Sequence, residues 1–108
     1  MRNDFLKILK MFVEEMQCNK DTKIGEIFEK PFGEVDLLTS VLVLECMYSI
    51  DVPDEFMDKD LSIAELVLKM ERLPKIEDPF WIANRFKVYV DNLGFRAKRD
   101  YDEKAEMN

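Results

Sequence analysis

Hydrophobic residues recur at helical spacing in four separate stretches of the chain. In residues 4–17 the apolar side chains fall on one helical face and the charged side chains on the other, as in an amphipathic helix. Residues 35–50 are apolar on nearly every side and too long for an ordinary strand, so they predict a largely buried helix. Two more helices are predicted over residues 62–73 and 79–93. The pattern therefore predicts an all-α protein.

Capping and terminating residues mark the limits of the later helices. Residues 62–65, Ser-Ile-Ala-Glu, form a capping-box pattern, and Asp78 followed by Pro79 is a helix-start signal. Gly94 suits the end of the last helix, and the polar residues after about Arg99 are expected to fray. We therefore expect a helical bundle over residues 1–76, followed by a docked helix and polar tail over residues 77–108.

The connection between the first two predicted helices, residues 18–34, mixes turn formers with large apolar residues. Asparagine, glycine and proline favour turns, but Ile24, Ile27, Phe28 and Phe32 would be costly to leave in water. We expect this segment to pack on the core, with a short helical turn around residues 24–29.

Charge is distributed unevenly and limits the classes of partner. The chain has a formal net charge of −7, with 16 basic and 23 acidic residues. Residues 1–78 carry 10 basic and 18 acidic residues, net −8, whereas residues 79–108 carry 6 and 5, net +1. An acidic surface repels phosphate backbones, so no nucleic-acid partner is expected. No stretch could span a bilayer and none resembles a signal peptide, so we expect a cytoplasmic protein without a membrane partner.

The residue types that usually perform catalysis or bind metals are scarce. Histidine is absent, and Cys18 and Cys46 are not closely spaced, so neither a zinc site nor a disulfide framework is expected. Both cysteines are interpreted as buried or half-buried free thiols. No glycine-rich phosphate loop, nucleophile–base pair or calcium loop occurs. These absences disfavour an enzyme, a metal site and a catalytic residue.

Two motifs separated by the apolar helix resemble the acyl carrier protein family. They are Gly33-Glu34-Val35-Asp36 before the helix and Val52-Pro53-Asp54 with Glu55 after it, followed by the capped helix from Ser62. The resemblance covers roughly residues 4–73. It implies a four-helix bundle, to which the last predicted helix is an addition. An ungapped count back from Pro53 places Glu34 at the serine that carries phosphopantetheine in the family, Val35 at the following leucine and Gly33 at the preceding aspartate.

The substitution at position 34 changes the function that the resemblance implies. A serine hydroxyl can attack the pyrophosphate of coenzyme A, whereas the Glu34 carboxylate would give a labile mixed anhydride and would repel the phosphate. Glu34 is therefore predicted to stand at the position where the family binds its cofactor, and to be non-functional there. No phosphopantetheine is expected. The resemblance instead implies a non-catalytic protein-binding module. Its acidic surface, for a partner with a basic patch, would use Glu34, Val35, Asp36, Asp54 and Glu55, extended by Glu45, Asp58 and Asp60.

Two alternatives to this reading remain open. The chain could be a genuine acyl or peptidyl carrier modified at another hydroxyl, for which Thr39 and Ser40 are the nearest residues. It could also be an unrelated helical subunit whose proline motif matches the family by chance.

The last predicted helix carries a heavy aromatic load. Aromatic residues are enriched at protein interfaces, so Phe80, Trp81, Phe86 and Tyr89 could mediate self-association or hold a partner. They could equally cover the core of the bundle itself. In the family the acyl chain enters between the second and third helices, and Phe80, Trp81 or Phe86 could fill that space here.

Overall fold

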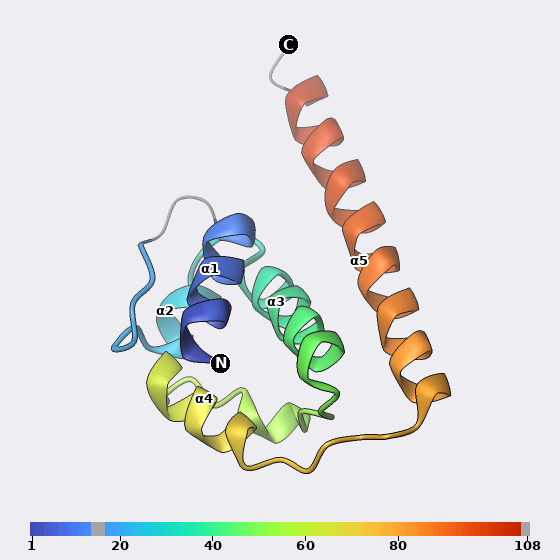
Figure 1. Ribbon diagram of the computed structural model, residues 1–108. Helices are drawn as coiled ribbons and strands as arrows, with labels where there is room; N and C mark the ends of the chain where they lie inside the picture. The colour runs from blue at the N-terminus through green and yellow to red at the C-terminus, as the bar shows by residue number, and fades with distance from the viewer. Residues whose placement is uncertain (14–16, 107–108) are drawn as a thin grey trace.

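Every regular element of the described chain is a helix. The computed structural model describes residues 1–13 and 17–106. Its elements are α1 (Arg2–Phe12), α2 (Ile24–Phe28), α3 (Gly33–Tyr48), a short 3₁₀ helix η1 (Asp54–Phe56), α4 (Ile63–Glu71) and α5 (Pro79–Glu106), arranged as in Figure 1. The described residues contain one isolated backbone bridge, Lys23 with Ser62, and no strand. The predicted all-α class is confirmed.

The core lies where α1, α3 and α4 meet. Each of these helices places one apolar face inward, with residues three or four apart along the chain. The buried side chains are Phe5, Ile8, Leu9 and Phe12 from α1, Leu37, Val41 and Leu44 from α3, and Ile63, Leu66, Val67 and Met70 from α4. Burying a side chain of this size contributes roughly 1.5–3 kcal/mol relative to leaving it exposed. These three helices therefore fix the framework on which the rest is placed.

The helix limits agree with the sequence except at the ends of the first and last helices. α1 ends at Phe12, with Val13 as its C-cap, so the predicted extension to residue 17 is wrong at both Val13 and Gln17. Residues 14–16 of that prediction lie outside the described residues. The capping box of α4 is confirmed: Ser62 Oγ accepts from the N–H of Glu65 at 3.2 Å, and the Glu65 carboxylate accepts from the N–H of Ser62 at 3.2 Å.

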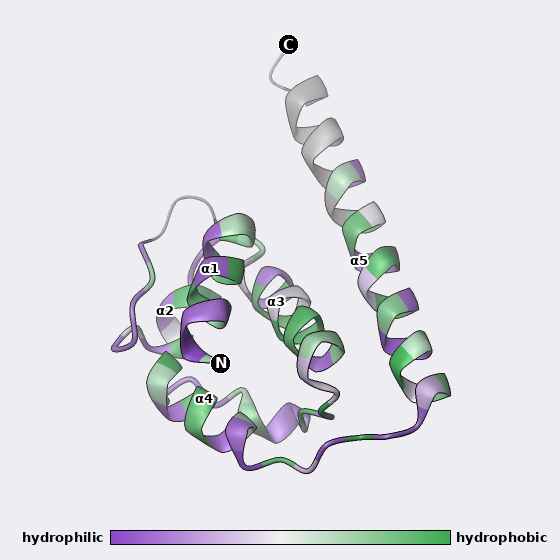
Figure 2. Cartoon of the chain, viewed as in Figure 1, coloured by the Kyte–Doolittle hydropathy of each residue, from purple (hydrophilic) through white to green (hydrophobic). Residues whose placement is uncertain are grey.

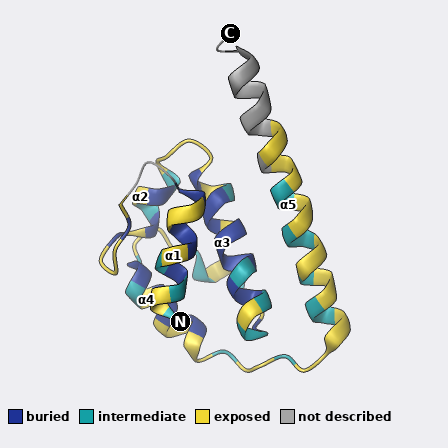
Figure 3. Ribbon diagram, turned by 45° about the horizontal axis from the view of Figure 1, so that its top comes forward, coloured by how far each residue is buried: buried dark blue, intermediate teal, exposed yellow. Residues whose placement is uncertain are grey.

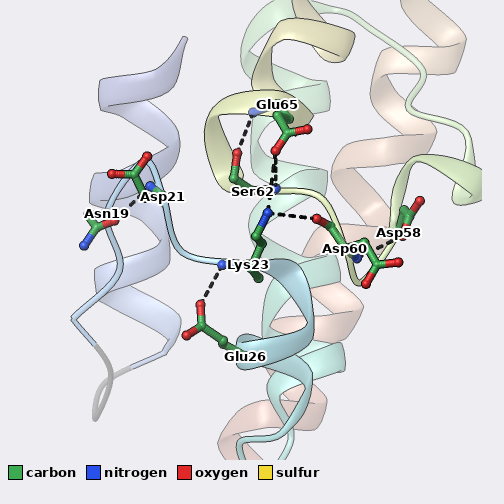
Figure 4. Close-up of polar contacts among 8 residues, drawn as sticks. All are labelled: Asn19, Asp21, Lys23, Glu26, Asp58, Asp60, Ser62 and Glu65. Atoms are coloured by element: carbon green, nitrogen blue, oxygen red, sulfur yellow. Dashed lines mark hydrogen bonds and ion pairs between the residues drawn. The ribbon is translucent and has the colours of Figure 1, made fainter.

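The connection between α1 and α3 is packed on the bundle through α2, as expected for Ile24, Ile27 and the half-buried Phe28, but Phe32 is 43% exposed, so the expectation that it packs on the core is wrong. Ile24 and Ile27 of α2 are fully buried. Lys23 joins α2 to the start of α4: its Nζ donates to the carbonyl of Asp60 at 3.2 Å and lies 3.9 Å from the Glu65 carboxylate (Figure 4). Backbone bonds beside this contact, Ile24 N to Leu61 O at 2.9 Å among them, continue the junction. The segment leading into α3 is thereby held in place.

α5 begins where the sequence predicts but ends much later. The Asp78 carboxylate accepts from the N–H of Phe80 at 2.9 Å, which confirms the start signal. The predicted end at Gly94 and the frayed tail after Arg99 are wrong, because the helix continues to Glu106. Gly94 has no positive φ, and a glycine inside a helix costs only about 1 kcal/mol, which the helix-forming residues on both sides can offset. The distal part of α5 projects past the bundle (Figure 1).

Candidate functional site

A tight turn presents the start of α3, where the sequence places Glu34. The N–H of Gly33 donates to the carbonyl of Lys30 at 2.9 Å, which closes a four-residue turn with Pro31 in its second position. Phe32, in the third position, has φ 61° and ψ 14°, a left-handed conformation that turns of this kind usually give to glycine. A non-glycine residue held in this region costs about 1–3 kcal/mol, and such strain concentrates at functional sites.

Gly33 is required by the packing of this turn against α2. A Cβ at this position would lie 1.8 Å from the carbonyl oxygen of Ile27 and 2.8 Å from its carbon. Both atoms are backbone and cannot give way as a flexible side chain would. No residue with a side chain fits without moving α2 away from α3. The aspartate that the acyl carrier resemblance would place here is therefore excluded by close packing.

Glu34 lies in the first turn of α3 and is exposed. Val35 beside it is half-buried. Asp36 is only 6% exposed and Glu45 only 3% exposed, so the expectation that these two acids belong to an exposed surface is wrong. Both face inward because α3 is covered by neighbouring elements on most sides.

The hydroxyl groups nearest to Glu34 are enclosed by the helix. Thr39 is 2% exposed and its Oγ1 donates to the carbonyl of Val35 at 2.9 Å. Ser40 is fully buried and its Oγ donates to the carbonyl of Asp36 at 2.8 Å. Both hydroxyls are bonded within α3, and another protein could reach neither without opening the core.

A pocket of about 420 Å³ lies beside α3, one helical turn beyond Glu34. Leu38, four residues after Glu34 and so on the same face of the helix, stands at its edge. The pocket is bounded by α3, by the segment from Asp51 to Met57 that includes η1, and by α5. Its lining residues are Leu38, Val41, Leu42, Glu45, Asp51, Val52, Pro53, Asp54, Met57, Arg85 and Asn92.

One end of this pocket is apolar and the other is charged. At the charged end the Glu45 carboxylate accepts from the N–H of Val52 at 3.0 Å and lies 3.9 Å from Arg85 Nε. Arg85 Nη2 donates to the Asp51 carboxylate at 3.1 Å, and the guanidinium stands 5.1 Å from the centre of the Trp81 ring. These contacts tie α5 to the C-terminal part of α3 and to the loop that follows it.

Glu45 is the most strongly buried acid of this cluster. Burial raises the pKa of its carboxyl above the ordinary value of 4.5, and the hydrogen bond from Val52 and the charge of Arg85 oppose the shift. Within the described residues Arg85 Nε is buried and makes no hydrogen bond. The pair is therefore a loose contact between charges and does not form the forked arrangement that gives arginine–carboxylate pairs their strength.

The other predicted acids divide into two groups. Asp54 and Glu55 are exposed on η1, and Asp54 also lines the pocket. Asp58 and Asp60 belong instead to the junction around Lys23, where the Asp58 carboxylate accepts from the N–H of Asp60 at 2.9 Å (Figure 4). The structure thus places Asp54 and Glu55 on the element that borders the pocket, and Asp58 and Asp60 at the structural contact between α2 and α4.

The aromatic residues of α5 do not fill the pocket, contrary to the expectation for Phe80, Trp81 or Phe86. Phe80 is 84% exposed and Phe86 57% exposed, because α5 turns them away from α3. Trp81 is half-buried against Arg85, and Tyr89 is half-buried beside the core. α5 closes one side of the pocket with the polar residues Arg85 and Asn92.

Sequence reasoning did not find Arg85 and Asn92. Their signal was their spacing: they stand four and eleven residues after Trp81, which puts all three on one helical face. Only the aromatic residues of this helix were considered as candidates, so the polar residues on the same face as Trp81 were not recognised.

Cys18 is buried and Cys46 half-buried, and both are free thiols, as their interpretation from the sequence expected. Burial raises the pKa of both thiols, which lowers their reactivity. The described residues hold no cluster of histidine, cysteine and acidic side chains that could bind a metal ion.

No model of a known protein family matches the chain, and neither a curated protein nor a solved structure matches it. In the part of the chain that the structure describes, no helix is both long and apolar enough to cross a membrane.

Proposed function

We propose that this chain is an acyl-carrier-like, non-catalytic protein-binding module that does not carry phosphopantetheine at position 34. The observation that carries the proposal is the exposed Glu34 carboxylate on the first turn of α3. That is the place where the family displays its serine. The order of elements supports the same assignment: a long helix, a packed loop, a buried helix, a short helix after Pro53 and a capped helix from Ser62.

The chemistry at position 34 separates this module from a working carrier. Transfer of phosphopantetheine from coenzyme A requires an oxygen nucleophile that gives a stable phosphodiester. A carboxylate would give an acyl phosphate, which water hydrolyses readily, and its negative charge opposes the approach of the pyrophosphate. The module therefore keeps the surface by which a carrier meets its enzymes and lacks the group that is loaded.

The surface offered to a partner combines charge with an apolar edge. Glu34 on α3 and Asp54 and Glu55 on η1 are exposed acids near the two ends of the pocket wall formed by these elements. Val35, which is half-buried, and Leu38, which is exposed and lines the pocket, add apolar area on α3 next to Glu34. A partner with a basic patch would be attracted by the acids and would bury the apolar residues, and added salt would slow the encounter.

A carrier modified at another hydroxyl is less well supported. Thr39 and Ser40 are bonded within the helix and enclosed by the core, so a transferase would have to unfold α3 to reach either oxygen. The sequence also lacks histidine, the residue that most often serves as the general base of an enzyme.

Intact mass spectrometry after incubation with a phosphopantetheinyl transferase and coenzyme A tests the proposal. The natural chain should keep its mass, whereas Glu34→Ser should gain one phosphopantetheine. Glu55→Ser is the matched control, since it makes the same change at another exposed acid next to the pocket. It should gain nothing.

Two outcomes would contradict the proposal. Loading of the natural chain would make it a carrier, and failure to load a folded Glu34→Ser variant would remove position 34 from the carrier site. A competition arm tests the binding surface: the natural chain should slow loading of Glu34→Ser by occupying the transferase. The slowing should weaken as salt is added.

A further inference from the structure

α3 and α5 run in opposite directions beside each other (Figure 1). They meet at the C-terminal end of α3, where Arg85 Nε lies 3.9 Å from the Glu45 carboxylate. Toward the start of α3 they separate: Leu38 of α3 and Asn92 of α5 line the pocket of about 420 Å³, and Glu34, four residues before Leu38, is exposed. The pair of helices is therefore closed at one end and open at the other.

The residues at these two places show which parts of the two helices lie side by side. Glu45 is seven residues after Leu38 on α3, and Asn92 is seven residues after Arg85 on α5. Because each residue of an α-helix adds the same rise, equal numbers of residues along two antiparallel helices cover equal lengths. The contact at Arg85 and the pocket at Asn92 therefore belong to one register, in which each residue of α3 has a counterpart on α5.

In this register the counterpart of Glu34 is Arg96. Glu34 is four residues before Leu38, and Arg96 is four residues after Asn92. At about 100° per residue, each of the two lies within about 40° of the residues that define the register on its own helix. An acid at the start of α3 and a base on the distal part of α5 thus occupy corresponding positions on the two stripes along which the helices meet.

Tilting α5 onto the start of α3 would bring opposite charges together and cover apolar surface. Residues 1–78 have a formal net charge of −8 and residues 79–108 a net charge of +1, so the two parts attract each other. The exposed Leu38 lies between Glu34 and the existing contact, so closure would remove it from water. None of the described residues of α5 is buried, so the helix can tilt without moving a core residue. We propose that α5 is an autoinhibitory helix, whose distal part closes over the first turn of α3 so that Arg96 pairs with Glu34 in place of the basic patch of a partner.

This inference rests on the proposed function, because α5 and the partner compete for the same carboxylate. One exposed ion pair and one apolar side chain stabilise the closed form only slightly, so closed and open chains should both be populated. A partner then binds the open chains and shifts the population toward them. Added salt should also open the helix, because it screens the attraction between Glu34 and Arg96.

Hydrogen–deuterium exchange of the full chain tests closure through the amides of residues 93–106, which exchange more slowly when this part of α5 is held on α3. Arg96→Gln and Glu34→Gln should each speed their exchange about two- to fivefold, the effect of losing one exposed ion pair. The double variant should exchange no faster than either single variant, because both changes remove the same pair.

Lys98→Gln is the matched control for Arg96→Gln. It removes the same charge two residues away, from an exposed position about 160° around α5 from Arg96. Arg96 and Lys98 are each followed four residues later by an aspartate, so the two changes affect pairing within the helix equally. Lys98→Gln should exchange like the natural chain, and helix content measured by circular dichroism should be equal in all variants.

Competition for the phosphopantetheinyl transferase tests the inhibitory role. Arg96→Gln leaves Glu34 open, so it should slow the loading of Glu34→Ser at a concentration about two to five times lower than the natural chain needs. Lys98→Gln should need the same concentration as the natural chain, although it has the same net charge as Arg96→Gln.

Equal exchange in Arg96→Gln and Lys98→Gln would overturn the inference, since Arg96 would then make no special contact. Unchanged exchange in Glu34→Gln would also overturn it, because the contact of Arg96 would not be Glu34. Equal competition by the natural chain and Arg96→Gln would remove the inhibitory role and leave the proposed function standing. If neither slows loading, the proposed function has failed at its binding surface, and inhibition fails with it.

Discussion

α3 and α5 lie side by side but are held in place by different forces. Of the 16 residues of α3, nine are buried, whereas none of the described residues of α5 is. In Figure 3 α3 shows much dark blue, while α5 shows only yellow and teal along its described length. Figure 2 shows apolar and polar residues interleaved along α5. A helix surrounded by core has one stable position, whereas a helix on the surface depends on a few contacts.

This difference has a consequence for how each helix can take part in function. α3 supplies a rigid platform, so Glu34 and the pocket wall keep their positions. α5 is attached through half-buried contacts such as Tyr89 and through the cluster of Arg85 with Glu45 and Asp51. Partly exposed ion pairs usually contribute no more than about 1 kcal/mol, so α5 should open more readily than α3.

The largest expected effect comes from truncating the core face of α3. Leu44→Ala removes a fully buried side chain and should lower the free energy of unfolding by about 2–5 kcal/mol. Phe95→Ala removes a larger side chain from the surface of α5 and should change it by no more than about 0.5 kcal/mol. Urea unfolding followed by circular dichroism measures both. Similar losses for the two variants would mean that α5 is as much a part of the core as α3.

Two glycines provide a sharper version of the comparison. Gly33→Ala drives a Cβ into the backbone of Ile27 and should destabilise the fold by about 1–3 kcal/mol. A Cβ at Gly94 has no neighbour within 4 Å, so Gly94→Ala should stabilise α5 by about 0.5–1 kcal/mol. Thermal unfolding should move in opposite directions for the two variants. A stabilised Gly33→Ala variant would contradict the tight turn that presents Glu34.

The smallest effect is the pH dependence contributed by Glu45, at the contact between the two helices. Burial raises the pKa of this carboxyl in the folded state, so the folded chain binds the proton more tightly than the unfolded chain. Stability should therefore fall as the pH rises from about 4.5 through the raised pKa, and then level off.

Glu45→Gln keeps an oxygen that can accept from the N–H of Val52 but does not titrate. The free energy of unfolding of the natural chain minus that of Glu45→Gln, measured by urea unfolding at several pH values, isolates the contribution of Glu45 from those of the other carboxyls. This difference should decrease with rising pH. A difference that is flat or increases would show that Glu45 is not held in a desolvated site.

The amount that could be predicted differs between the parts of the fold. The limits of α3 and α4 and the start of α5 follow from local signals, namely apolar spacing, the Ser62 capping box and Asp78 before Pro79. The end of α5 could not be predicted from local signals, because Gly94 interrupts a helix only weakly when strong helix formers stand on both sides. For the candidate site, local pattern located Glu34 on an exposed first turn. The local pattern did not predict the burial of Asp36 and Glu45. When a helix is covered on most sides, periodicity alone cannot tell which of its residues lie at the surface and which in the interior.

The sequence by itself determined that this protein is helical, where its central helices lie, and that the residue on the first turn of α3 is a glutamate, Glu34. Those properties depend on spacing and on residue type, which act over a few neighbouring residues. Only the tertiary structure decided that Asp36 and Glu45 are buried, that Arg85 rather than a phenylalanine borders the pocket, and that one stripe of α5 stays uncovered. These depend on which surfaces of distant segments meet, and no local pattern contains that information.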